Sequence, residues 1–316
     1  MIAPKLLQKV IVFGSINMDL VVKTPRLPSR GETLLGHDFF TAPGGKGANQ
    51  AVAVAQLGIP SCMVGRVGCD REGTSLLSSL QTYGVQTDSI SIDETTHSGV
   101  AVIAVEDSGQ NNIIVVPGAN GRVNTEDVLK LSNIFDNTAA VLLQFEIPLS
   151  AVFAAAKAAQ NAGIKVILDP APAGQNIPEA LYPLVDIITP NQTEASQLVG
   201  FEVNSIETAK AAAAVLLQRG VKTAAIAKLG ALGVFCATAE ESFFVPAFPV
   251  EAVDTVAAGD AFNGGLAAAL AQGHSLRQAV IWGAAAGALA TTKTGAMPSL
   301  PNRDTFNQFL KQRQIV

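Results

Sequence analysis

The sequence predicts an α/β fold: a doubly wound, mostly parallel sheet covered by helices on both faces, with a small β-sheet lid. Short β-branched runs alternate along the chain with alanine-rich helical runs. The expected strands are continuously apolar, which is typical of strands that are buried on both faces. Two groups of short extended segments interrupt this alternation and predict the lid. We expect all residues, 1–316, to form a single domain.

The alternation assigns the elements of the main sheet in order. Apolar, β-branched runs are expected to be buried strands at residues 10–13, 62–64, 140–143, 165–168, 187–189 and 223–227. Runs rich in alanine or with helical spacing are expected to be helices at residues 47–57, 72–83, 149–161, 194–199, 206–219, 261–271, 276–291 and 303–312. A further strand is expected to follow residues 228–233.

Two segments do not fit a βαβ core. The first holds short extended pieces divided by prolines and a glycine, at residues 20–22, 33–35 and 39–41. The second is typical of a hairpin, with strands at 100–105 and 112–116 and a turn at 107–109. We predict that the two segments, about 17–43 and 98–118, form a separate lid sheet over one edge of the main domain. An apolar face on so small a sheet favours pairing with a second copy, hence a homodimer.

The composition argues against several classes of function. The net charge is −5 at pH 7, and no lysine or arginine cluster provides the basic surface that nucleic acids and anionic membranes need. Every apolar run is shorter than the roughly 20 residues of a membrane span. The three cysteines fit free thiols in a reducing compartment, and residues 10–13 fit a strand better than a signal peptide. We therefore expect a cytoplasmic protein with neither nucleic-acid nor membrane partners.

The segment DTVAAGDAFNGG, at residues 254–265, is the strongest candidate for chemistry. Small residues crowd a turn that opens into a helix, where unpaired amide N–H groups attract anions. Ala257, Ala258 and Gly259 leave room for an anion, and Asp260 stands where a carboxylate can take a proton from an attacking hydroxyl. The alternative is that Asp260 is only a helix N-cap.

The motif GGKGANQ, at residues 44–50, opens an earlier helix. It matches neither a Walker loop nor the dinucleotide fingerprint. Lys46 and Asn49 offer donors to a ligand, or the glycines form only a hinge between the lid and the core.

The motif GSINMD, at residues 14–19, ends the first strand. Asn17 and Asp19 alternate along an extended chain and can face the same side, where a carboxylate accepts from two sugar hydroxyls. The alternative is an Asx turn that leads into the lid.

Three later sites follow expected strands. Asn191 and Glu194 form either a capping box or a site near magnesium-bound phosphate oxygens at the strand ends. Glu146 points into the same crevice or is merely solvated. Residues 228–233, KLGALG, either wrap a nucleotide or form a simple hairpin.

Each motif is ambiguous by itself, but their order is not. GSINMD, GGKGANQ, QFEIP, TPNQTEA, KLGALG and DTVAAGDAFNGG resemble, in this order, the ribokinase branch of the carbohydrate kinase family named after the minor bacterial phosphofructokinase. The resemblance runs from about Val10 to the last helix. It implies a lid that pairs two subunits, and ATP-dependent phosphorylation of a small sugar, with ribose at O5 as the expected acceptor.

The resemblance also implies roles for single residues. Asp260 matches the base that activates the sugar hydroxyl, and the amides at 257–259 match the anion hole. The sugar-contacting positions are Asn17, Met18, Asp19, Gly45, Lys46, Gly47, Ala48, Asn49, Glu146 and Asp260. The nucleotide-contacting positions are Asn191, Lys228, Leu229, Gly230, Ala231, Leu232, Gly233, Gly259, Asp260 and Ala284.

Two kinds of cation are implied by the same resemblance. Asn191 and Glu194 match the pair that organises Mg²⁺ with ATP, through water. An activating K⁺ beside the anion hole would be held at Asp254, Val256, Ala290, Lys293, Gly295 and Ser299, several of them through backbone carbonyls.

The chain departs from the family pattern on the nucleotide side. Lys228 stands where a threonine is frequent, and Ala284 stands where a histidine or asparagine often lies near adenine. These changes bear on nucleotide preference. Two alternatives remain: a kinase of the same family acting on deoxyribose, fructose or a nucleoside, and a catalytically silent sugar-binding protein.

Overall fold

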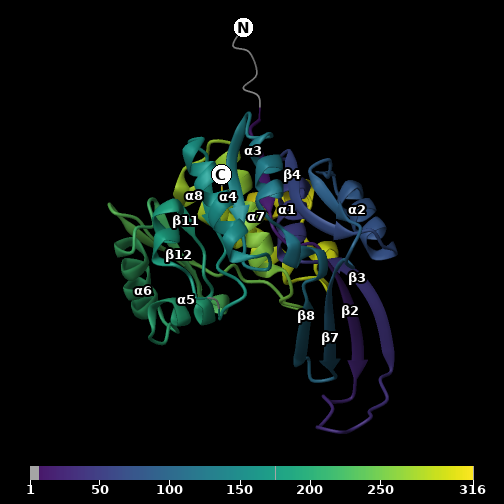
Figure 1. Cartoon of the computed structure of the whole chain (residues 1–316). Coiled ribbons are helices and arrows are strands. Elements are labelled where there is room, and N and C mark those ends of the chain that lie inside the picture. Colours follow the sequence, from purple (N-terminus) through teal and green to yellow (C-terminus); the bar gives the residue numbers. More distant parts are fainter. Residues whose placement is uncertain (1–6, 175, 316) are drawn as a thin grey trace.

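A computed structural model describes residues 7–174 and 176–315, with a large helix-covered sheet and a smaller sheet that projects from it (Figure 1). The strands are β1 (Lys9–Phe13), β2 (Asn17–Thr24), β3 (Asp38–Gly44), β4 (Ser61–Gly68), β5 (Val85–Gln86), β6 (Ile90–Asp93), β7 (Gly99–Glu106), β8 (Asn111–Val116), β9 (Thr138–Leu143), β10 (Lys165–Leu168), β11 (Ile187–Ile188), β12 (Ala224–Lys228), β13 (Gly233–Ala237) and β14 (Ser242–Pro246). The α-helices are α1 (Lys46–Gln56), α2 (Arg71–Thr82), α3 (Thr125–Ser132), α4 (Leu149–Asn161), α5 (Gln192–Val199), α6 (Ile206–Gln218), α7 (Ala258–Ala271), α8 (Leu276–Ala290) and α9 (Arg303–Gln312).

The large sheet is doubly wound, as the sequence predicts. Its order is β14-β13-β12-β11-β10-β9-β1-β4-β5, and β6 also pairs with β4. The strands from β12 to β5 are parallel, whereas β13 and β14 form an antiparallel edge. From β1 the chain first builds outward through β4 and later in the opposite direction through β9. The carboxyl ends of β1 and β9 therefore flank a topological switch point, where open α/β sheets bind ligands.

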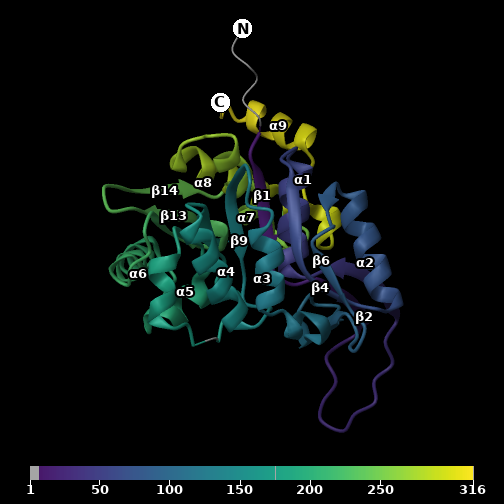
Figure 2. The ribbon, with the colours of Figure 1, turned by 45° about the horizontal axis from the view of Figure 1, so that its top comes forward.

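Helices cover both faces of this sheet, and the alternation within β1 shows it directly. Val10 and Val12 join a core with α1, α2, α7, α8 and α9. Ile11 and Phe13 join a second core with α3, α4, α5 and α6. Burial on both faces is what makes these strands continuously apolar. Figure 2 shows α9, the last helix, at the end of the molecule opposite the long loop of the lid.

The lid is a separate four-stranded sheet with the order β3-β2-β7-β8. β2 and β7 are parallel, and the two outer pairs are antiparallel. The predicted sheet and its hairpin are thus confirmed. One expected piece is wrong: residues 33–35 form no strand and lie in the loop between β2 and β3, where Leu35 is exposed.

The short strands β5, β6 and β14 and the helix α3 are not among the predicted elements. β5 and β6 have two and four residues, and they form because both pair with β4. The expected strand 187–189 is shorter by one residue. None of the helices in the described part of the chain is long and apolar enough to cross a membrane.

Candidate active site

A cavity of about 940 Å³ opens at the carboxyl ends of the parallel strands. Its walls are the segments after β10, β11 and β12, the first turns of α5 and α7, and one side of α8. Lys46 enters it from the start of α1. The cavity thus lies at the same edge of the sheet as the switch point, and Lys46, Asn191 and Asp260 bring three of the predicted motifs to it.

Asp260 lies in the first turn of α7 with 5 % of its surface exposed. Asn49 Nδ2 donates to one carboxylate oxygen at 3.0 Å, and Gln50 Nε2 donates to the other at 3.1 Å. The N-cap of α7 is Ala257, which has a left-handed backbone with φ of 59°. The interpretation of Asp260 as an N-cap is therefore wrong, because its oxygens bind α1 instead of the start of its own helix.

The pKa of Asp260 rises to about 6, and burial is the main cause. Lys46 opposes this rise through its positive charge, whereas Asp169 adds to it through like-charge repulsion. The hydrogen bonds from Asn49 and Gln50 lower the pKa again. A carboxylate with a pKa just below neutrality is ionised at pH 7 and still basic enough to take a proton.

The amides at the start of α7 find few acceptors among the residues that the structure describes. The Ala258 amide donates to the Thr255 carbonyl at 3.3 Å, a long turn bond. Within residues 7–174 and 176–315, the amides of Gly259 and Asp260 have no protein acceptor. Both residues line the cavity together with Ala257 and Ala258, which fits the expected anion hole.

A second polar cluster lies where the chain passes from β1 of the main sheet to β2 of the lid. Glu146 accepts hydrogen bonds from Ser15 Oγ at 2.6 Å and from the Lys46 amide at 3.1 Å, with Asn17 Nδ2 at 3.5 Å. Asn17 is held from its other side by Asn120 Nδ2, at 2.7 Å from Asn17 Oδ1. Glu146 is therefore not simply solvated.

Asp19 and Asn49 complete this cluster as candidate sugar ligands. The pKa of Asp19 rises to about 7, first through burial and then through the charges of Glu146 and Asp260. The Asn49 Oδ1 atom is buried without a partner among the described residues. A buried acceptor without a donor costs stability, and a sugar hydroxyl would satisfy it.

Lys46 is surrounded by carboxylates. Burial lowers its pKa, but Asp260, Asp169, Glu146 and Glu194 together raise it above its usual value. The ammonium group therefore stays charged in the cleft.

The glycines of GGKGANQ allow the lid and the core to approach closely. Gly45 has φ of 90°, and a Cβ there would lie 2.7 Å from the Asn17 amide nitrogen. A Cβ on Gly47 would lie 2.6 Å from the Ser15 nitrogen. The hinge and the ligand-binding interpretations are thus compatible, because the hinge brings Lys46 to the cleft.

Two of the expected sugar-contacting side chains lie elsewhere. Met18 and Ala48 are buried in the hydrophobic core. Because Met18 alternates with Asn17 and Asp19 along β2, its side chain points away from theirs. Neither side chain lies in the polar cluster.

On the nucleotide side, Asn191 and Glu194 form the predicted capping box of α5. The Glu194 carboxylate accepts from the Asn191 amide at 2.8 Å and from Asn191 Nδ2 at 2.9 Å. Burial is the main cause that raises the pKa of Glu194, and the charge of Asp169 adds to it. Both capping residues also line the cavity, so the capping box does not exclude a role near bound phosphates.

Residues 228–233 form the hairpin between β12 and β13, and they border the cavity. Lys228, Gly230, Ala231 and Gly233 line it, as does Ala284 on α8. The other two expected contacts do not: Leu229 is buried in the second core, and Leu232 is exposed outside the cavity lining.

Three of the expected K⁺ positions, Asp254, Val256 and Gly295, meet at one junction. The Asp254 carboxylate accepts from the Val256 amide at 3.0 Å and from the Gly295 amide at 2.9 Å, which joins the turn before α7 to the segment after α8. Ala290 accepts from the Lys293 amide at 3.4 Å, and the buried Ser299 hydroxyl donates to the Ala296 carbonyl. No group of three or more His, Cys, Asp or Glu side chains forms a metal site in the part of the chain that the structure describes.

Sequence reasoning missed residues that hold the others in place. Asp169 follows β10 directly, and Gln50 Nε2 donates to it at 3.0 Å. Gln144 Nε2 donates to Gln50 Oε1 at 2.6 Å. The position of Asp169 immediately after a buried strand is the same signal that pointed to Glu146, and it could have been applied again.

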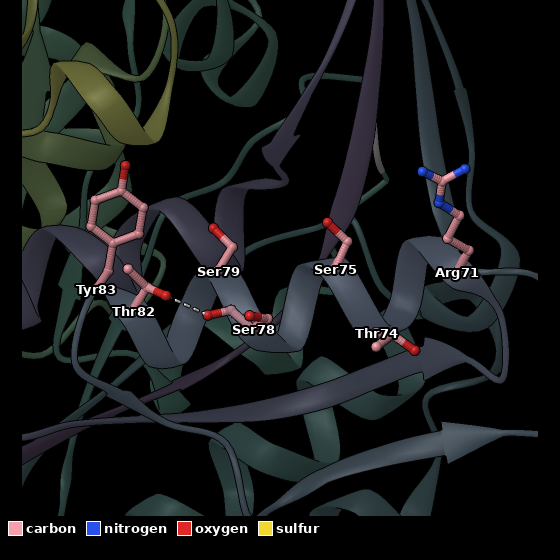
Figure 3. Close-up of a pocket in the computed structure, with 7 residues that line it drawn as sticks. All are labelled: Arg71, Thr74, Ser75, Ser78, Ser79, Thr82 and Tyr83. Atoms are coloured by element: carbon pink, nitrogen blue, oxygen red, sulfur yellow. Dashed lines mark hydrogen bonds between the residues drawn. The ribbon is translucent and has the colours of Figure 1, made fainter.

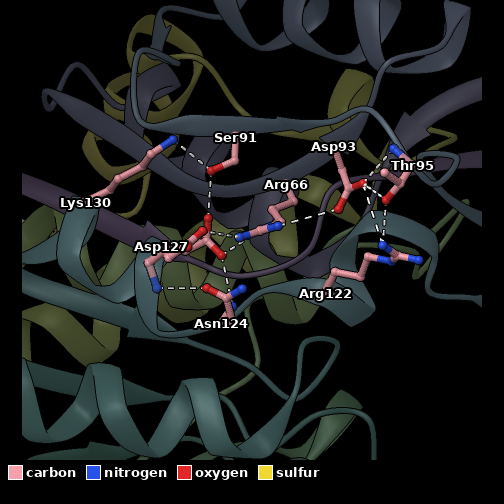
Figure 4. A network of polar contacts seen from close by, with 9 residues as sticks. Arg66, Ser91, Asp93, Thr95, Arg122, Asn124, Asp127 and Lys130 are labelled. Carbon is pink, nitrogen blue, oxygen red and sulfur yellow. Dashed lines mark hydrogen bonds and ion pairs between the residues drawn. The ribbon is translucent and has the colours of Figure 1, made fainter.

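Asn120, which orients Asn17, belongs to a short 3₁₀ turn at Gly118–Arg122. Figure 4 shows the ionic network around this turn. Arg66 Nε binds Asp127 at 2.7 Å, and Arg66 Nη1 lies 3.5 Å from Asp93. Thr95, two residues after Asp93, accepts a hydrogen bond from Arg122 at 2.6 Å. The network ties the base of the lid to β4 and α3.

A second hollow, of about 680 Å³, lies along α2 (Figure 3). Its lining comes from α2 and the residue after it: Arg71, Thr74, Ser75, Ser78, Ser79, Thr82 and Tyr83. It contains none of the motif residues, so the strand-end cavity is the candidate active site.

Comparisons with known proteins agree with this geometry. The family model of pfkB carbohydrate kinases matches residues 7–303. The chain belongs to the pfkB carbohydrate kinase family. A ribokinase from Haemophilus influenzae is 41 % identical over 300 residues, which cover 95 % of this chain and 97 % of the relative. A deoxyribokinase from Salmonella typhi is 34 % identical over 95 % of this chain and 98 % of its own.

The fold comparison reaches the same family. The structure of Arabidopsis thaliana ribokinase complexed with ribose and ATP has a TM-score of 0.89 and 36 % identity, and it covers 97 % of this chain and 99 % of that one. The predicted family, fold and enzyme class are therefore confirmed: this pfkB protein is a sugar kinase.

Proposed function

We propose that this pfkB kinase transfers the γ-phosphoryl group of ATP to O5 of D-ribose, with Asp260 as the base. The observation that carries the proposal is the position of Asp260, a buried carboxylate that α1 binds. It lies beside the amides of Gly259 and Asp260, which have no acceptor among the described residues. The ribokinase relatives support ribose as the acceptor.

In the proposed mechanism, ribose lies between the lid and the core. Asn17, Asp19, Lys46 and the unpaired Asn49 Oδ1 orient its hydroxyls, and Asp260 takes the proton from O5 as this oxygen attacks the phosphorus. The amides at the start of α7 stabilise the charge that spreads over the transferred group. Closure of the lid excludes water, which would otherwise compete as the acceptor.

Asn191 and Glu194 would hold Mg²⁺ through water, because both carboxylate oxygens of Glu194 already accept hydrogen bonds from Asn191. When bound, the ion neutralises charge on the ATP phosphates. The raised pKa of the buried Glu194 fits a site where a cation would favour its ionised form.

The Asp254 junction would hold the activating K⁺. Its carboxylate would provide the kind of oxygen ligand that such a cation prefers. Asp254 also fixes the turn that carries Ala257, so the cation would shape the anion hole without touching the substrate. We further propose a cytoplasmic homodimer that pairs through the lids.

Release of ADP from ATP and Mg²⁺ tests the function, with D-ribose, 2-deoxyribose, fructose and adenosine as acceptors and with or without K⁺. Ribose should give the highest kcat/KM, the product should carry phosphate at O5, and K⁺ should raise the rate. Higher turnover of deoxyribose would favour the alternative that the Salmonella typhi deoxyribokinase suggests. No turnover of any acceptor would favour a silent sugar-binding protein.

The role of Asp260 is tested by Asp260→Ala, which should lower kcat at least about 100-fold with little change in the KM for ribose. Asp88→Ala, a change at an exposed turn, serves as the control. Near-normal turnover of the Asp260 variant would eliminate this assignment.

A further inference from the structure

Asp169 is a buried carboxylate that the proposed mechanism does not use. Only 2 % of its surface is exposed, and it directly follows β10. Its Oδ2 accepts from Gln50 on α1, and its Oδ1 lies 2.9 Å from the Lys228 ammonium at the end of β12. One carboxylate therefore connects α1, whose side chains bind Asp260, with the hairpin on the nucleotide side.

Lys228 is bound through both its backbone and its ammonium group. Its amide donates to the Pro190 carbonyl at 2.9 Å, and its side chain is only 14 % exposed. A Cβ placed on Gly259 would lie 3.4 Å from the Lys228 ammonium nitrogen. The ammonium is thus next to the free amides at the start of α7, in the wall of the cavity.

The charges around this point need such a cation. Asp169 and Glu194 both border the cavity, and the charge of Asp169 raises the pKa of Glu194 and of Asp260. Two carboxylates would repel a triphosphate. Lys228 neutralises Asp169, and it lowers the pKa of Glu194 by the same attraction.

We propose that Asp169 and Lys228 act as one unit, in which Asp169 is a positioning residue that holds the Lys228 ammonium against the nucleotide phosphates at the start of α7. Lys228 then contacts phosphate oxygens that ATP and ADP share, while Asp169 contacts only protein. This inference rests on the proposed ATP-dependent reaction.

If the two residues act as one unit, the effects of the single substitutions on activity should not add in the double variant. Lys228→Thr leaves the Asp169 carboxylate buried and unpaired beside the phosphates, whereas Asp169→Asn keeps the contact to Gln50 but frees the ammonium. Removing one partner of a buried pair is more damaging than removing both. The double variant Asp169→Asn/Lys228→Thr leaves no unpaired charge.

The experiment measures kcat, the KM for ATP and the KM for ribose in these three variants. Lys228→Thr should lower kcat/KM for ATP about 100-fold and Asp169→Asn about 10-fold, with the KM for ribose within about threefold. The double variant should be no worse than Lys228→Thr. Lys222→Thr, at an exposed lysine before β12, is the matched control.

Several outcomes would overturn the proposal. Multiplicative losses would show that the two residues act separately, and a rise confined to the KM for ribose would show that Lys228 does not serve the nucleotide. ADP affinity, measured by calorimetry with Mg²⁺ on variants whose thermal unfolding is cooperative, provides a second test. Lys228→Thr should weaken it at least about 10-fold, and unchanged affinity would contradict the proposal.

ADP binding also separates the two proposals. If the unmodified protein does not phosphorylate ribose, the proposed function fails, while the effect of Lys228→Thr on ADP affinity still decides the role of the pair. If one single variant does not fold, the other single variant and the double variant give the same decision through ADP affinity.

Discussion

Asp260 combines function with a cost to stability. Its pKa of about 6 in the folded chain exceeds the ordinary value of 3.8 because the charged form is buried. The folded state therefore binds a proton more readily than the unfolded state, and the protein loses stability as pH rises from about 4 to about 6. Active-site residues often carry such a penalty.

Asp260→Asn should therefore abolish turnover and stabilise the fold at neutral pH. The gain is at most about 3 kcal/mol, and Asn49 can rotate its amide to accept from the new side chain because its Oδ1 has no partner among the described residues. Thermal unfolding should show the largest difference above about pH 6 and almost none near pH 4. A variant less stable than the unmodified protein at pH 8 would contradict this.

The pH dependence of catalysis reports on the same carboxylate. Asp260 is faced by Lys46 on α1, by Asp169 after β10 and by the amides of Asn49 and Gln50, and Asp19 on β2 is near enough to feel its charge. Since Asp260 must be ionised to act as a base, kcat/KM for ribose should fall below about pH 6.

Lys46→Met should move this acid limb to higher pH, because the Lys46 charge lowers the pKa of Asp260. The profile of kcat/KM against pH is the measurement, with Lys23→Met on the exposed part of β2 as the control. An unchanged limb, or one at lower pH, would exclude electrostatic coupling between the two residues.

At the scale of elements, the contact between α1 and α7 sets the active-site distances. α1 carries Asn49 and Gln50, and α7 carries Asp260. The helices approach closely at Gly264, where an added Cβ would collide with the Cβ of Ala53. Only the absence of a side chain permits this approach.

Gly264→Ala should destabilise the protein by about 1–3 kcal/mol and lower kcat, because overpacking moves α7 away from α1. Ala53→Gly/Gly264→Ala transfers the methyl group across the interface and should restore part of both losses. Thermal unfolding and steady-state turnover measure the two effects. If the double variant is worse than Gly264→Ala, the helices do not compete for this space.

At the scale of the whole molecule, the lid carries an apolar surface. The side chains of β8 are exposed throughout, and Phe39 and Phe40 on β3 are also exposed. β3 and β8 are the two edges of the sheet. Exposed apolar edge strands favour association, which supports pairing through the lids.

Ile113→Glu/Ile114→Glu should convert the proposed dimer into monomers, because charges would be buried at its interface. Sedimentation equilibrium measures the mass. Leu129→Glu on α3 is the matched control, since Leu129 and Ile114 are both 65 % exposed and α3 belongs to the main domain. A monomeric unmodified protein, or a variant that remains dimeric, would contradict pairing through β8.

The sequence by itself determined the doubly wound sheet, the lid and the family. Local signals suffice for these features: continuous apolar runs report burial on both faces, and glycine-rich turns lead into helices. The motifs containing Asp260, Lys46 and Glu194 were found for the same reason, because each lies within a few residues of its own signal.

Only the tertiary structure decided which residues meet. Asp169 touches Gln50 and Lys228, which are 119 and 59 residues away along the chain, and Asn120 holds Asn17 from 103 residues away. Met18 and Ala48 stand inside sugar-site motifs, yet the packing turns both into the core. Long-range pairing is fixed by the burial of whole faces, and no local pattern encodes it.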